Sequence, residues 1–177
     1  MMSKIGLIVE GDSDKLFFDT YFKPKFMKNL LVRTSGKKGT CKILNEKTIQ
    51  SHVKALRLQN CTKIIILIDL KTQCDSITHE CLKKLKIWYK SKINISNDED
   101  IVVSVISKDI EGWMLSSWGK SDNKSKSDLK RKFESESHNG KSMNEKELFK
   151  KFNSSKQPIN PNNNQSLHYF MNKLGLV

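Results

Sequence analysis

The sequence predicts an α/β fold built on a mostly parallel sheet of about four strands. Two short β-branched apolar runs, residues 4–9 (KIGLIV) and 63–68 (KIIILI), do not alternate with polar residues, as expected of strands buried on both faces. Residues 30–34 (LLVRT) and 101–106 (IVVSVI) are weaker runs of the same kind. Helical patterns separate the four runs, so we expect right-handed crossovers between parallel strands.

Apolar residues at helical spacing mark the segments between these strands. Residues 14–23 predict a first helix, which Pro24 is expected to end. Two later helices are each expected to bury one apolar face against the sheet. These faces consist of Ile43, Leu44, Ile49, Val53 and Leu56 in one helix, and of Ile77, Cys81, Leu82, Leu85, Trp88 and Tyr89 in the other.

The sequence changes character after residue 119. Residues 120–142 are nearly all polar and predict a flexible or partly ordered insert. Short helices are expected at 143–152 and 165–174, with an Asn/Pro-rich loop (QPINPNNN) between them. We therefore expect an α/β domain over residues 1–119, followed over 120–177 by a basic polar insert and a small helical C-terminal appendage.

Composition indicates the class of partner. The net charge of +13, from 32 Lys and Arg against 19 Asp and Glu, favours polyanions, because cations placed on phosphates release counterions. A lysine-rich genome produces the same bias, so the charge needs a site beside it. The four cysteines form no C-x-x-C pair, which indicates reduced thiols in a cytoplasmic protein rather than zinc ligands. No targeting segment or membrane-spanning run is evident, so no membrane partner is expected.

Carboxylates recur directly after the predicted strands. Glu10 follows the first strand, Asp69 the third, and Asp109 and Glu111 the fourth. The carboxyl ends of parallel strands share one edge of the sheet, where open α/β folds bind their ligands. Because carboxylate oxygens suit Mg²⁺ or Mn²⁺, these acids are candidates for a metal site.

Each acid also has a structural explanation. Glu10 fits a solvated strand end equally well. Asp69 is the hardest to explain in this way, because a carboxylate that closes an apolar strand is costly without a partner. Helix capping or a contact with a helix dipole is the alternative for Asp12, Ser13, Asp109 and Glu111.

Three stretches together resemble a known family. VEGDSD at residues 9–14 fits the pattern V-E-G-x-x-D, the apolar strand at 63–68 is followed by Asp69, and DIEGW lies at 109–113. They are similar to the TOPRIM domain, the metal-binding α/β module of topoisomerases, bacterial primases and OLD-family nucleases, and most similar to its small standalone, OLD-like members. The resemblance covers roughly residues 4–119. It implies a Rossmann-like TOPRIM fold and a Mg²⁺-dependent (or Mn²⁺-dependent) nuclease that cleaves DNA or RNA.

The resemblance also assigns roles to residues. Glu10 matches the family's glutamate, which is a metal ligand or general acid/base, and Asp69 matches the first aspartate of its D-x-D motif. Glu111 matches the additional acid of the OLD-like branch. These three residues are the expected catalytic and metal-binding residues, and Asp109 and Asp75 are further candidate ligands.

The sequence departs from the family at Lys71, which stands where D-x-D has its second aspartate. An ammonium in place of a carboxylate changes the local charge by two units and weakens cation binding. Asp75 is a candidate substitute ligand, and Lys71 is a candidate phosphate contact.

A Gly/Lys-rich segment, SGKKGTCK at 35–42, lies between the second strand and its helix. Its glycines permit unusual backbone angles, and the following helix offers free N–H groups to a phosphate. The expected phosphate or nucleic-acid contacts are Lys37, Lys38, Gly39 and Thr40, together with Lys71. An ordinary basic turn explains the segment equally well.

Three functions are compatible with these observations. The leading one is a metal-dependent TOPRIM-type nuclease. The alternative is a catalytically weakened TOPRIM module that binds nucleic acid or a partner protein, with a partner ATPase among the open possibilities. A third is an unrelated α/β phosphatase with Asp69 as its nucleophile. Core packing rather than base stacking is expected of Trp88, Trp113 and Trp118.

Overall fold

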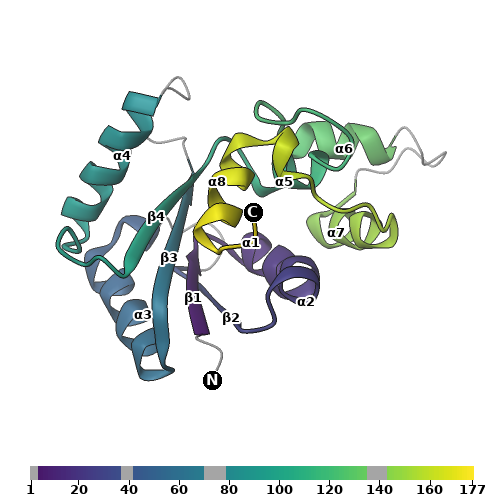
Figure 1. Ribbon diagram of the computed structural model, residues 1–177. Helices are drawn as coiled ribbons and strands as arrows, with labels where there is room; N and C mark the ends of the chain where they lie inside the picture. Colours follow the sequence, from purple (N-terminus) through teal and green to yellow (C-terminus); the bar gives the residue numbers. More distant parts are fainter. Residues whose placement is uncertain (1–3, 37–41, 70–78, 135–142) are drawn as a thin grey trace. The chain divides into compact units, whose positions relative to one another are not determined.

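The computed structural model describes residues 4–36, 42–69, 79–134 and 143–177 (Figure 1). The chain divides into two compact units, Met1–Val105 and Ile106–Val177, which are described separately below. The domain boundary expected at residue 119 rests on composition and resemblance, and it stays a prediction.

The first unit is organised around a four-stranded sheet in which all strands are parallel. Its strands, in the spatial order β2-β1-β3-β4, are β2 (Leu30–Thr34), β1 (Lys4–Val9), β3 (Cys61–Asp69) and β4 (Ile101–Ile106). The predicted α/β class with a parallel sheet flanked by helices is confirmed. β3 is longer than the predicted run, because it begins at Cys61 and includes Asp69.

β1 is central to the sheet because it pairs with two partners. On one side Val9 pairs with Thr34 of β2, and on the other side Ile8 pairs with Ile66 of β3. From β1 the chain moves first to β2 at one edge and later to β3 on the opposite side. The topological switch point of the sheet therefore lies between β1 and β3.

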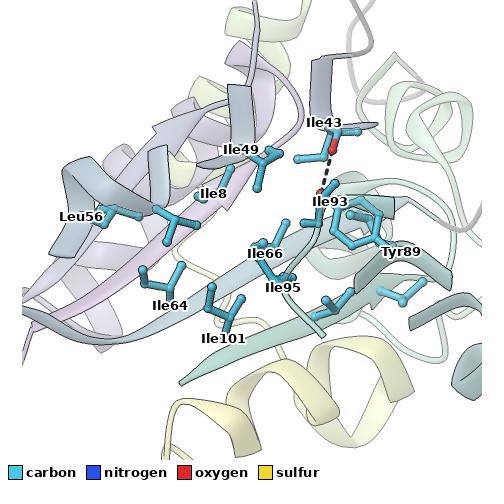
Figure 2. Close-up of a cluster of buried hydrophobic side chains, with 14 of the residues drawn as sticks. Ile8, Ile43, Ile49, Leu56, Ile64, Ile66, Tyr89, Ile93, Ile95 and Ile101 are labelled. Atoms are coloured by element: carbon cyan, nitrogen blue, oxygen red, sulfur yellow. Dashed lines mark hydrogen bonds between the residues drawn. The ribbon is translucent and has the colours of Figure 1, made fainter. Parts of the chain in front are cut away.

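One face of the sheet is covered by α3 (Glu46–Leu58) and α4 (His79–Lys92), as Figure 1 shows. Alternate residues of the strands point toward these helices, and the predicted face of α3 and the Leu82, Leu85, Trp88 and Tyr89 part of the second predicted face pack against them. Ile77 and the side chain of Cys81 lie outside what the structure describes. Residues labelled at this interface in Figure 2 include Ile8, Ile64 and Ile66 from the strands and Ile49, Leu56 and Tyr89 from the helices. Gly6 allows the close approach of α3, because a Cβ there would lie 2.7 Å from the Cδ1 atom of Leu56.

The segment after β1 is a helical run with a wide central turn. It consists of α1 (Asp12–Phe17), a π-helical turn (Phe18–Phe22) and α2 (Lys23–Phe26). The prediction that Pro24 ends the helix is wrong. Pro24 instead occupies the first turn of α2, where its missing N–H costs little.

The second unit is helical. Its helices are α5 (Ile110–Leu115), α6 (Lys126–Glu134), α7 (Glu145–Ser154), the 3₁₀ turn η4 (Pro161–Asn163) and α8 (Gln165–Lys173). The two short C-terminal helices are therefore confirmed. Within the insert that was expected to be flexible or partly ordered, α6 is an ordered helix that the sequence did not predict, and the buried Leu129 and Phe133 fix it in the unit.

A buried polar network connects the segments of the second unit. Asn164, the N-cap of α8, accepts hydrogen bonds from the Leu167 N–H at 3.0 Å and the Ser166 hydroxyl at 2.8 Å. Its side-chain amide donates to the Ser121 hydroxyl at 3.1 Å. The Trp113 indole N–H donates to the Ser166 hydroxyl at 2.8 Å. Among the described residues, no helix is long and apolar enough to cross a membrane.

Candidate metal site

Glu10 and Asp69 lie at the carboxyl edge of neighbouring strands. Ile8 pairs with Ile66, so Glu10 stands two residues and Asp69 three residues beyond this pair. Strands about 4.8 Å apart that rise about 3.3 Å per residue place these two Cα atoms roughly 6 Å from each other. Both residues are half-buried, and they flank the switch point between β1 and β3.

The backbone at Glu10 is fixed by Ser35, the residue that follows β2. The Ser35 N–H donates to the Val9 carbonyl at 2.9 Å, and the Ser35 hydroxyl donates to the Glu10 carbonyl at 3.1 Å. Ser35 is buried, so water does not compete for either bond. The Glu10 side chain therefore starts from a well-defined backbone position.

The turn after Glu10 is organised by a different acid from the ones expected. Gly11, in an extended conformation, is the N-cap of α1, and its N–H donates to the Asp14 carboxylate at 3.1 Å. The prediction that Asp12 or Ser13 caps this helix is wrong. The helix begins at Asp12, so Asp14 is the third helical residue, from which a side chain reaches back to the N-cap N–H.

The two later acids belong to the second unit. Asp109 is at the N-cap position of α5, as expected, but its carboxylate makes no capping bond to that helix. It accepts instead from the Lys126 N–H at 3.3 Å. Glu111 lies in the first turn of α5 and is only 5% exposed. A carboxylate so buried requires compensating polar contacts, which distinguishes Glu111 from an ordinary solvated helix acid.

The described residues contain no group that forms a metal cage. Among them, no group of three or more His, Cys, Asp and Glu side chains could hold a metal ion. Mg²⁺ is commonly held by one or two carboxylates, with waters and phosphate oxygens completing its octahedral shell. A site of that kind at Glu10 and Asp69 stays a prediction.

The remaining predicted site residues lie outside the described residues. They are Lys37, Lys38, Gly39 and Thr40 in the Gly/Lys-rich segment, and Lys71 and Asp75 after β3.

Described residues anchor the chain on both sides of 37–41. Ser35 is tied to the end of β1, as described above. On the other side, the buried Tyr89 hydroxyl donates to the Ile43 carbonyl at 2.7 Å (Figure 2). The positions at which this segment leaves and rejoins the first unit are therefore fixed.

The tryptophans divide into two kinds. Trp113 is fully buried and packs against Phe170 with ring centroids 5.0 Å apart, and Trp88 packs against the core of the first unit. Core packing is confirmed for these two. Trp118 is 37% exposed and lines a hollow in the second unit, which sequence reasoning missed.

A scan against family models and searches of curated proteins and of solved structures found no significant match to this chain. The TOPRIM resemblance therefore remains a prediction from the motifs.

Proposed function

We propose that this protein is a Mg²⁺-dependent nuclease of TOPRIM type that cleaves phosphodiester bonds in DNA or RNA in the cytoplasm. One observation supports the proposal most strongly. Glu10 and Asp69 extend from neighbouring parallel strands at the switch point, which is the usual ligand-binding position of an open α/β sheet.

The chemistry assigns a role to each carboxylate. Glu10 and Asp69 would hold a Mg²⁺ ion, which when bound supplies Lewis-acid stabilisation of the phosphoryl oxygens. A water oxygen forms a bond to phosphorus while the bond to the leaving oxygen breaks. Glu10, which the resemblance also gives as a general acid/base, would accept the proton of that water, and the leaving oxygen takes a proton from solvent.

The acids of α5 receive separate assignments. The resemblance adds Glu111 as a third catalytic acid, and its burial sets it apart from surface carboxylates. Asp109 is assigned a structural role, because its carboxylate accepts the N–H of Lys126 at the start of α6.

The substrate class follows from charge. The net charge of +13 favours the phosphate backbone, and Lys37, Lys38 and Lys71 are proposed to contact it.

The alternative is a weakened TOPRIM module that binds nucleic acid or a partner protein without cleaving. Two observations favour it. The described residues supply two carboxylates at the sheet edge but no group of three metal ligands, and Lys71 replaces an expected aspartate.

Cleavage of labelled single- and double-stranded DNA and RNA, with Mg²⁺, Mn²⁺ or EDTA, tests the proposal. We expect metal-dependent cleavage. Glu10→Gln and Asp69→Asn should each reduce its rate by roughly 10²–10⁴-fold, the range for losing a general acid or base. Glu111→Gln is assayed in parallel for the third acid. Glu99→Gln is the matched control, because Glu99 is exposed and precedes β4 at the opposite edge of the sheet.

The outcomes separate the three functions. Cleavage that persists in Glu10→Gln contradicts the nuclease proposal. Metal-independent, salt-sensitive binding without cleavage supports the binding module. Turnover of a small phosphoester that is lost in Asp69→Asn points to a phosphatase.

A further inference from the structure

The second unit contains a hollow of about 490 Å³, within the range of roughly 300–1,000 Å³ that is usual for ligand sites. It is formed by the segment after α5 and by one side of α6. The side chains that matter for recognition are Trp118, Lys120, Lys124, Asp128, Arg131 and Lys132. Four of these six are cations and one is an acid.

The single acid already has partners. Asp128 accepts hydrogen bonds from the Ser125 N–H at 2.8 Å and from the Ser125 hydroxyl at 3.1 Å. The Arg131 guanidinium lies 3.9 Å from the same carboxylate. The four cations of the hollow outnumber this one carboxylate, so an anionic ligand is favoured.

Trp118 gives the hollow a flat aromatic surface. The ring packs nearly perpendicular to Phe133 of α6, with centroids 5.9 Å apart, and against Phe152 of α7, with centroids 6.0 Å apart. These contacts hold the indole in place, although 37% of the residue is exposed. The Lys132 ammonium lies 4.4 Å from the centre of the ring, so it covers one face of the indole and shows that this face accepts a cation.

The walls of the hollow are fixed by contacts within the unit. An ion pair between Lys126 and Glu145 connects α6 with α7. The Lys120 ammonium donates to the Asn162 carbonyl at 3.1 Å, and the Ser121 N–H donates to the Asn163 carbonyl at 2.9 Å. The aromatic surface and the backbone that carries the cations are therefore arranged before a ligand arrives, which reduces the entropy lost on binding.

We propose that this hollow binds one nucleotide unit of a single-stranded nucleic acid, with its base stacked on Trp118 and its phosphates paired with Lys124, Arg131 and Lys132. A base stacked on an indole is favoured over the single half-buried lysine that lies above the ring, and the displaced Lys132 ammonium moves onto a phosphate. A duplex hides its base faces, and an acidic peptide lacks them. The site involves the second unit alone and requires neither the metal nor Glu10.

Binding of a labelled ten-nucleotide single strand, followed by fluorescence anisotropy in EDTA, tests the assignment. We expect Trp118→Leu to weaken binding by roughly 5–100-fold, the range for losing one stacked base, while Trp118→Phe retains most of the affinity. Arg131→Gln is expected to weaken binding a few-fold. Lys150→Gln, which removes an exposed cation of α7 outside the hollow, is the control and is expected to change affinity less.

Ligand probes identify what is recognised. A base-free (abasic) strand of the same length should bind wild type no better than the normal strand binds Trp118→Leu, and duplex and polyglutamate should bind more weakly. If wild type binds the abasic strand or polyglutamate as tightly as the normal strand, the proposed base stacking is wrong. If a mononucleotide binds as tightly as the normal strand, the proposal that the ligand is a strand is wrong. Quenching of tryptophan fluorescence by the strand, present in wild type and lost in Trp118→Phe, is expected.

Two controls keep the result independent of folding and of catalysis. Far-ultraviolet circular dichroism and thermal unfolding show whether Trp118→Leu has lost its fold. If it has, the strand affinities of Trp118→Phe and Arg131→Gln test the proposal in its place. A Trp118→Leu protein that is folded and binds like wild type overturns the proposal. Glu10→Gln should bind the strand like wild type, so loss of cleavage and loss of this site are distinguished.

Discussion

Gly112 shows how one missing side chain brings two segments together. A Cβ at this position would lie 2.9 Å from the carbonyl oxygen of Lys124 and 3.3 Å from that of Ser121. Both obstacles are backbone atoms, which cannot rotate away as a side chain can. The glycine of the DIEGW stretch therefore allows residues 121–124, which lead to the basic hollow, to pack directly on α5.

Gly112→Ala is expected to lower the free energy of unfolding by about 1–3 kcal/mol, because the added methyl group overpacks a tight contact. Chemical denaturation monitored by circular dichroism measures the loss. Gly11→Ala is the comparison, since a Cβ at Gly11 would meet only the Asp14 carboxylate, at 3.9 Å. A loss no larger than that of Gly11→Ala would contradict this account of the packing.

His52 shows how a neighbouring charge selects a protonation state. The Arg33 Nε–H donates to His52 Nδ1 at 3.3 Å, so that nitrogen carries no proton. Burial, and secondarily the positive charge of Arg33, lower the pKa of His52 below its ordinary value of 6.5. The folded protein therefore favours the neutral imidazole.

This lowered pKa predicts the direction of a pH effect. The unfolded chain takes up a proton at His52 more readily than the folded chain, so stability rises with pH in this window. The contribution of His52 is fully present above pH 6.5 and is lost as the pH falls from 6.5 through the lowered folded pKa. We expect His52→Gln to flatten the pH dependence of the unfolding free energy in this window, and an unchanged slope would contradict the assignment.

At the scale of elements, two asparagines cap helices in different surroundings. Asn45 caps α3 from an exposed position and accepts the Thr48 N–H at 2.9 Å. Asn164 caps α8, is 1% exposed and also bonds to Ser121 and Ser166. Asn45 thus bonds to the N–H and hydroxyl of one residue, Thr48, whereas the side chain of Asn164 bonds to Leu167, Ser121 and Ser166.

Asn164→Ala is expected to cost more than Asn45→Ala. The exposed cap should contribute about 1 kcal/mol, because water replaces part of the lost bond. Removing the buried cap leaves buried donors without partners, and about 2–4 kcal/mol is expected. Denaturant unfolding of the two variants gives the comparison, and equal losses would show that the buried network adds no stability.

The elements that the sequence predicted well are those that burial determines. The bounds of β1, β2 and β4 follow directly from continuous apolar runs. α6 was missed because, of its residues whose burial the structure describes, Leu129 and Phe133 alone are buried in a mostly charged segment, too few for a periodic signal. The continuation of the helical run through Pro24 was missed because it depends on a π-helical turn, and no sequence pattern predicts such a turn.

The candidate site was predictable to a similar extent. The strand-end rule places Glu10 and Asp69 together because parallel strands align their carboxyl ends, and a short apolar run indicates where each strand stops. The role of Asp14 depends on the exact residue at which α1 begins, and helix propensity does not locate a helix start to within two residues. The hollow around Trp118 was not predictable, because the fold gathers cations that the sequence distributes over residues 120–132.

At the scale of the whole molecule, the charge of +13 makes nucleic-acid binding depend on salt. The logarithm of the affinity for a single strand should fall linearly with the logarithm of salt concentration, by about 0.7 per phosphate contacted. Arg131→Gln should reduce this slope by about 0.7, whereas Trp118→Leu should weaken binding without changing it. Anisotropy titrations at several salt concentrations measure both, and a reduced slope for Trp118→Leu would contradict the separation of stacking from charge.

The position of β1 between β2 and β3 also affects the order of events during synthesis. β1 leaves the ribosome first, yet one of its two partners ends only at Asp69, so the strand cannot complete its pairing until β3 has emerged. Until then, the apolar run at residues 5–9 exposes a strand edge that can pair with other chains. The nascent protein is therefore most prone to aggregation while β1 and β2 are outside the ribosome and β3 is still inside.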